Sequence, residues 1–152
     1  LESTMEKVYE IYIKTTPELL WAAITDPEIR ARYNFGASLA TDWQVGSPLV
    51  MGAPGAPGPL GEGVVLEVDR PRRLVHTLHA LWGDDVAAEG SSRVTWEITQ
   101  VEDSCCLVVT HDQLRDGANS QLYGGWPMIL SGLKTWLETG ELLTTPGSLL
   151  HT

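Results

Sequence analysis

The sequence has few basic residues and no long hydrophobic run. Its 10 lysines and arginines are outnumbered by 20 aspartates and glutamates, which gives a formal net charge of -10. Nucleic acids and anionic membrane surfaces attract basic patches, so this charge balance excludes both as expected partners. No stretch is apolar over the roughly 18 residues that a membrane-spanning helix needs.

Cysteine is scarce, which excludes a disulfide framework. Cys105 and Cys106 are adjacent and fall on opposite faces of an expected strand, and neighbouring cysteines rarely bridge each other. The amino-terminal residues have the pattern of a charged strand and not of a signal peptide. We therefore expect a reducing, cytoplasmic location. Met5 looks like a natural start, so residues 1–4 are expected to be a cloning remnant or a flexible start.

The strongest pattern in the sequence predicts one long helix over residues 119–138. Five apolar residues recur at steps of three and four, which places them on one helical face: Leu122, Trp126, Leu130, Leu133 and Leu137. A helix this apolar needs a concave hydrophobic partner. Gly124, Gly125 and Pro127 predict a kink or a late start, and Gly140 predicts a left-handed end.

The residues before this helix mostly form strand patterns. We expect strands over residues 7–14, 43–51 (one or two strands), 63–69, 73–82, 92–101 and 105–112. Between the first two, Thr16-Pro17-Glu18 and Asp26-Pro27-Glu28 each combine a capping side chain, a proline and an acid. That combination predicts two short helices. Residues 34–42 and 83–90 are expected loops, and residues 52–61 an expected hairpin tip.

This element order predicts an α+β, helix-grip fold. A curved antiparallel sheet of six or seven strands wraps around the long C-terminal helix, and two short helices follow the first strand. One domain covers residues 5–140, and a loosely packed tail covers residues 141–152.

Several stretches, in order, resemble a known family: ELLWAAITDPE, TDWQVGSPL, GEGVVLEVDRPRRLVHTLH, SRVTWEI, VVTHDQL and GGWPMILSGLKTWLETG. They are similar to the carboxy-terminal type of domain related to the activator of heat-shock protein 90 ATPase, within the START-like, birch-pollen-allergen-like (SRPBCC) superfamily. The resemblance implies the same helix-grip fold over residues 5–140. It also implies carriers, polyketide cyclases or a stress-response co-chaperone as candidate functions, so the fold alone leaves the activity open.

No metal, cofactor or covalent catalytic site is expected from the pattern. His76 and His79 are three apart on an expected strand, so they face opposite sides and cannot chelate one metal together. Ser131 and the cysteines lack an activating motif, and no phosphate-binding loop is present. His111 could act as an acid or base in a pocket, but a hydrogen-bonded structural histidine is the favoured interpretation.

The aromatic residues carry the leading functional hypothesis. Trp21, Trp96 and Trp136 are expected to pack in the core. We expect a ligand site where the short helices, the hairpin tip and the start of the long helix meet: Tyr33, Trp43, Trp82, His111, Tyr123, Trp126 and Leu130. His111, Arg73 or Asn119 would supply the polar groups that orient a ligand.

The sequence therefore leaves three functional hypotheses. The first is a non-enzymatic domain that binds a small apolar or aromatic ligand between sheet and helix. The second is a co-chaperone-type interaction module, and the third is a cyclase- or hydrolase-like enzyme that uses His111. The absence of a convergent catalytic set favours binding over catalysis. A chaperone and a second copy in a homodimer are further candidate partners.

Overall fold

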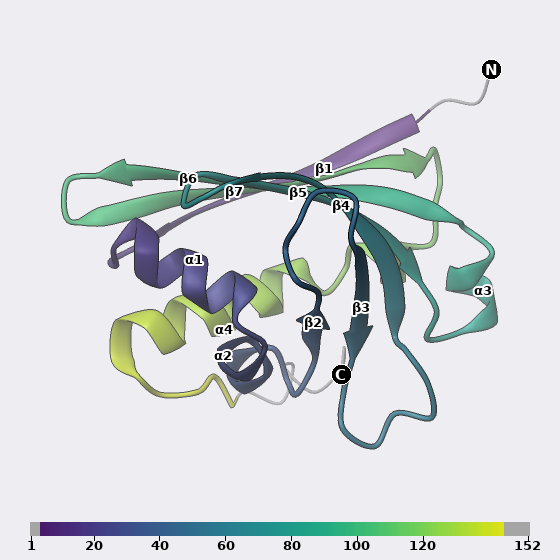
Figure 1. Ribbon diagram of the computed structural model, residues 1–152, viewed down its shortest axis with the longest axis horizontal. Coiled ribbons are helices and arrows are strands. Elements are labelled where there is room, and N and C mark those ends of the chain that lie inside the picture. The colour runs from purple at the N-terminus through teal and green to yellow at the C-terminus, as the bar shows by residue number, and fades with distance from the viewer. Residues whose placement is uncertain (1–3, 145–152) are drawn as a thin grey trace.

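The computed structural model describes residues 4–144 and confirms the helix-grip fold (Figure 1). A seven-stranded antiparallel sheet has the order β1-β7-β6-β5-β4-β3-β2. Its strands are β1 (Thr4–Ile13), β2 (Ser38–Ala40), β3 (Pro48–Gly52), β4 (Gly61–Asp69), β5 (Arg73–Ala80), β6 (Ser91–Val101) and β7 (Ser104–Arg115). Residues 1–3 and 145–152, which include parts of the expected start and tail, lie outside the described residues.

Two short helices follow the first strand, as predicted. They are α1 (Pro17–Thr25) and α2 (Pro27–Tyr33), each with its proline at the first position. The Thr16 hydroxyl accepts the Leu19 amide at 3.2 Å, and the Asp26 carboxylate accepts the Glu28 amide at 2.9 Å. These side chains accept hydrogen bonds from backbone amides that have no partner inside the helix. Asp26 ends α1 and caps α2, so the chain bends at this residue.

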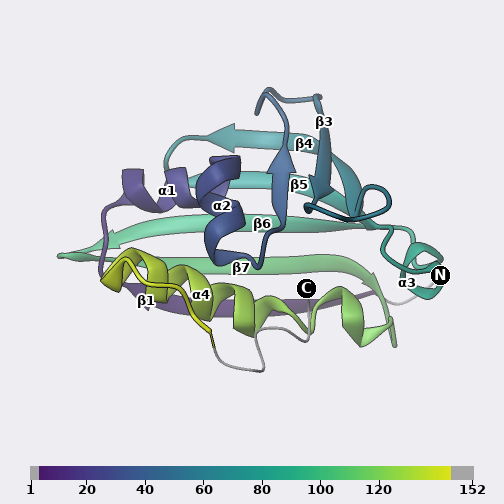
Figure 2. The same cartoon turned by 90° about the horizontal axis from the view of Figure 1, so that it is seen from below.

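The long helix starts late, as the glycines and proline predicted. α4 (Trp126–Thr139) is preceded by a separate 3-10 turn, η1 (Ser120–Leu122). Gly125 at its N-terminus provides no side-chain cap, and Gly140 at its C-terminus has φ 75, the left-handed conformation that was expected. Figure 2 shows α1, α2 and α4 on one face of the sheet. Within residues 4–144, no helix is long and apolar enough to cross a membrane.

Three local expectations were wrong. Trp43 lies outside any strand because it has φ 58, which interrupts an extended backbone; the strand begins only at Pro48. The expected loop over residues 34–42 contains β2, whose Leu39 is buried and pairs with Met51 of β3. The expected loop over residues 83–90 contains a short helix, α3 (Asp84–Ala87).

The main core lies between the concave face of the sheet and the three helices. Trp96 of β6 and Trp126 of α4 meet near its centre, with ring centroids 5.3 Å apart in an edge-to-face arrangement. On α4, Gly132 permits close packing, because a Cβ there would lie 2.7 Å from the carbonyl oxygen of Tyr33 at the end of α2. α4 therefore packs against both the sheet and α2.

Candidate functional site

Two buried histidines lie on the concave face of the sheet. His76 of β5 pairs with Val94 of β6, and Val94 pairs in turn with His111 of β7. Directly paired residues of an antiparallel sheet share a face, so both imidazoles point toward the core. Their exposed fractions are 2% and 0%. Buried polar groups need partners, and the partners define the centre of the site.

His111 belongs to a continuous hydrogen-bond network. The Trp126 indole Nε1 donates to His111 Nδ1 at 3.1 Å. An indole N–H can only donate, so Nδ1 accepts and the proton of the neutral imidazole resides on Nε2. That Nε2 lies 2.7 Å from Ser92 Oγ, which in turn donates to the Leu78 carbonyl at 3.2 Å. We call this the Trp126–His111–Ser92 network.

His76 adopts the opposite tautomer. The Trp96 indole Nε1 donates to His76 Nε2 at 3.2 Å, which leaves the proton on Nδ1. His76 Nδ1 then donates to the Thr77 carbonyl at 2.9 Å. Each imidazole therefore accepts a hydrogen bond from a tryptophan through one nitrogen, and its other nitrogen donates to a neighbouring group of the sheet.

Both histidines are neutral at ordinary pH. Burial lowers the pKa of His76 to about 4 and the pKa of His111 to about 4, because the charged imidazolium loses its hydration. Both nitrogens of His111 are also engaged. The residue is thus a hydrogen-bonded buried histidine, the interpretation favoured from the sequence, and its geometry offers no free nitrogen for acid–base catalysis.

Sequence reasoning missed Arg30, a charged side chain in the core. Arg30 lies on α2, is 4% exposed, and its Cζ lies 4.9 Å from the centroid of the Trp96 ring. Its Nη1 donates to the Ile24 carbonyl at 3.0 Å, whereas its buried Nε has no partner among the described residues. Burial lowers the pKa of this guanidinium. The available signal was spacing, because Arg30 is one helical turn before the buried Tyr33.

Most of the expected ligand residues converge on the core. Tyr33, Trp126 and Leu130 belong to the main hydrophobic cluster, and Trp43 and Tyr123 pack against it. His111 joins them through Trp126. The polar edges are satisfied by backbone: the Tyr33 hydroxyl donates to the Ala23 carbonyl at 2.7 Å, and the Trp43 indole donates to the Thr25 carbonyl at 3.1 Å.

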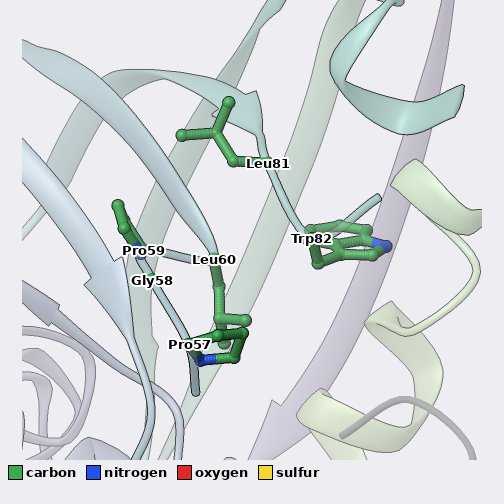
Figure 3. Close-up of a pocket in the computed structure, with 6 residues that line it drawn as sticks. All are labelled: Pro57, Gly58, Pro59, Leu60, Leu81 and Trp82. Carbon is green, nitrogen blue, oxygen red and sulfur yellow. The ribbon is translucent and has the colours of Figure 1, made fainter. Parts of the chain in front are cut away.

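Trp82 lies apart from this group, just beyond β5. It is 41% exposed and lines a surface pocket of about 410 Å³. Figure 3 shows the other residues that line this pocket: Pro57, Gly58, Pro59, Leu60 and Leu81. The pocket is mostly apolar, because the hairpin tip between β3 and β4 contributes its prolines there.

Two of the three polar groups expected to orient a ligand, Arg73 and Asn119, bind other side chains in the structure. Arg73 lies on the face of β5 opposite the buried Leu74, and it forms ion pairs with Glu67 at 2.7 Å and Glu97 at 2.8 Å. Asn119 caps η1 and donates to Asp85 at 2.9 Å. Successive residues of a strand face opposite sides of the sheet, so Arg73 cannot share the core face with Leu74. In residues 4–144, no group of three or more His, Cys, Asp or Glu side chains could hold a metal ion.

Comparison with known proteins identifies relatives of this chain. Residues 14–138 match the family described as Activator of Hsp90 ATPase homolog 1-like protein. Among solved structures, protein MLL2253 from Mesorhizobium loti is similar at 25% identity and a TM-score of 0.75, with 91% of this chain and 100% of that chain covered. Sequence comparison gave no match to a curated protein.

Two further structures have the same fold. The Aha1 dimer from Colwellia psychrerythraea is 17% identical, with a TM-score of 0.72 and coverage of 90% of this chain and 98% of that chain. PFC0360w, an HSP90 activator from Plasmodium falciparum, is 23% identical, with a TM-score of 0.68 and coverage of 88% of this chain and 95% of that chain.

Proposed function

Because this chain belongs to the Activator of Hsp90 ATPase homolog 1-like family, we propose that it is a START-like domain that binds a small apolar or aromatic molecule between the sheet and α4. The observation that carries the proposal is the convergence of Tyr33, Trp43, Tyr123 and Trp126 on one core, together with His111. Flat rings with polar edges suit an apolar ligand that needs few orienting groups.

The ligand contacts the rings around the first turn of α4. Trp126 is the first residue of this helix, and no side chain caps the helix N-terminus. Tyr9 of β1 is half-buried beside it, with the two ring centroids 6.4 Å apart, and the Tyr9 hydroxyl donates to the Tyr123 carbonyl at 3.2 Å. The ends of a helix open at a lower free energy than its interior, so we expect a ligand to enter at this uncapped turn, where it would break the hydrogen bond between Trp126 and His111.

A neutral fluorescent probe tests this function. N-phenyl-1-naphthylamine should bind the wild-type protein saturably, with a rise in its fluorescence. Trp126→Phe keeps most of the ring volume, removes the bond to His111, and should weaken probe binding severalfold. Trp136→Phe, at the other end of α4, is the matched control and should bind as the wild type does. Circular dichroism checks that each variant is folded. Absent saturation, or equal binding by both variants, would overturn the proposal.

Chaperone activation is the second candidate function, and the family description favours it. PFC0360w, which shares the fold, is described as an HSP90 activator. The outer face of the edge strand β1 leaves Val8 56% and Tyr12 54% exposed, so apolar side chains are available outside the core. Adding the protein to a purified Hsp90 ATPase assay decides this candidate: stimulation above the basal rate supports it, and an unchanged rate rejects it.

We also propose that the protein forms a homodimer. The Aha1 protein from Colwellia psychrerythraea is described as a dimer, and it shares the fold. Light scattering across a dilution series measures the mass in solution. A mass of one chain at every concentration would reject the dimer.

A further inference from the structure

The buried guanidinium of Arg30 lacks a counter-ion. None of the ion pairs formed within residues 4–144 includes Arg30. Two titratable groups that interact with it electrostatically do not supply a negative charge: burial raises the pKa of Tyr33 to about 12, so that phenol is neutral, and His76 is a neutral imidazole. A buried, unpaired charge is costly in a core, so its presence calls for a partner.

The donors that remain free on Arg30 point to the form of that partner. The face of the guanidinium lies against the Trp96 ring, with Cζ 4.9 Å from the ring centroid. Nη1 makes the one hydrogen bond of this group within the described residues, to the Ile24 carbonyl at 3.0 Å. The edge formed by Nε and Nη2 is left over, and the buried Nε is without a partner there. Two parallel N–H groups on one edge match the two oxygens of a carboxylate.

We propose that the ligand of this domain is an apolar or aromatic carboxylic acid, whose carboxylate binds the Nε–Nη2 edge of Arg30 beside Trp96. This inference rests on the proposed binding function and names its ligand class. A single negative charge balances the single buried cation. The aromatic residues of the core then contact the apolar body of the ligand. A dianion such as a phosphate monoester would leave one buried charge uncompensated and is disfavoured for that reason.

A pair of isosteric probes separates this inference from the binding function itself. 2-Naphthoate and 2-naphthamide have the same ring system and differ in the charge of one group. A charge-assisted bidentate contact in a buried site should make 2-naphthoate bind about ten- to a hundredfold more tightly to the wild-type protein. Isothermal titration calorimetry at pH 7 gives both dissociation constants.

Variants of two neighbouring arginines assign the effect. Arg30→Leu should reduce the preference for 2-naphthoate to less than about threefold while 2-naphthamide still binds, because the free carboxylate-binding edge is gone. Arg30→Gln repeats the test with a polar, uncharged side chain. Arg32→Leu is the matched control: Arg32 lies on the same helix but is exposed, with its Cζ 5.6 Å from the Trp136 ring centroid, and the preference should survive its loss.

Each outcome has a distinct meaning. Equal affinity of the two probes for the wild type would overturn the carboxylate inference and leave the binding function standing. A preference that persists in both Arg30→Leu and Arg30→Gln would overturn the role of Arg30. Failure of both probes to bind the wild type would overturn the inference and count against the binding function as well. The wild-type comparison decides the ligand class even if the Arg30 variants do not fold.

Discussion

His111 accepts the indole N–H of Trp126 through Nδ1 at 3.1 Å, and this one bond determines which tautomer the imidazole adopts. His76 accepts the indole N–H of Trp96 through the other ring nitrogen, Nε2, at 3.2 Å. The two central tryptophans are thus each fixed to a strand by a neutral histidine. Protonation of either histidine would remove an acceptor from the core, which makes the fold sensitive to acid.

Stability should fall as the pH drops from 6.5 toward 4. The pKa of His76 and of His111 is about 4 in the folded protein, below the ordinary value of 6.5. The unfolded chain therefore binds protons at a higher pH than the folded one, and protonation favours unfolding. The loss is on the order of 3 kcal/mol per histidine across this window. Urea denaturation at several pH values measures it.

A His111 variant distinguishes the contribution of the histidines to acid destabilisation from that of the carboxylates. Glu89 and Glu138 have pKa values held below the ordinary 4.5, chiefly by hydrogen bonds from Arg115 and Lys134, so the stability they contribute is lost only at more acidic pH. His111→Gln should be less stable at pH 7 but should lose less stability between pH 6.5 and 4.5 than the wild type. If the free energy of unfolding of His111→Gln falls with pH as steeply as that of the wild type, His111 is not a cause of the acid sensitivity.

Ser92→Ala should destabilise the protein by about 1–3 kcal/mol. Ser92 is 5% exposed, and its hydroxyl connects His111 Nε2 to the Leu78 carbonyl, so its removal leaves the buried Nε2–H of His111 without its acceptor. Ser91→Ala, at the exposed neighbouring position of β6, is the control and should stay within about 0.5 kcal/mol of the wild type. Equal denaturation midpoints for the two variants would argue against the Trp126–His111–Ser92 network.

Gly132→Ala should destabilise although alanine is the better helix former. Intrinsic propensity would add up to about 1 kcal/mol of stability. The new Cβ would lie 2.7 Å from the Tyr33 carbonyl oxygen, so α4 must move away from α2. We expect a net loss of about 1–3 kcal/mol, read from thermal and urea denaturation. Ser131→Ala, exposed on the same helix, serves as the control, and a more stable Gly132→Ala would refute the close approach.

Gly63→Ala tests the packing of β4 on β5. A Cβ at Gly63 would overlap the backbone carbonyl of Thr77, whose hydroxyl also accepts the Val64 amide at 2.9 Å. The strands must separate locally, and a loss of about 2 kcal/mol or more is expected. Gly58→Ala, in the hairpin tip that leads into β4, meets no atom within 4 Å and should unfold like the wild type. The midpoint of urea unfolding compares the two.

Local signals made the fold predictable from sequence. Capping side chains at Thr16 and Asp26 mark the two short helices, and Gly140 ends α4 in the predicted left-handed conformation. Trp96, which was expected to pack in the core, is buried. These features depend on neighbours within a few residues, which is the range over which propensity and pattern act.

The candidate site depends on contacts between distant elements, and there the sequence was less informative. The pairing of Trp96 with His76 joins two strands, and the burial of Arg30 depends on the sheet that α2 covers. Charged side chains are usually exposed, so a helical pattern alone assigns Arg30 to solvent. Trp43 leaves its expected strand because tertiary bonding to Thr25 compensates for its positive φ.

The pairing of β1 with β7 has a consequence for how the chain is made. The first strand finds its partner only at the far end of the sheet sequence, where Thr4 lies opposite Arg115 and Ile13 opposite Cys105. During synthesis β1 emerges before the other strands of the sheet, and neither of its edges is paired until β7 has left the ribosome. Such long-range pairing places the protein among the slower-folding topologies. The interval before β7 arrives is therefore when the nascent chain is most exposed to misassociation.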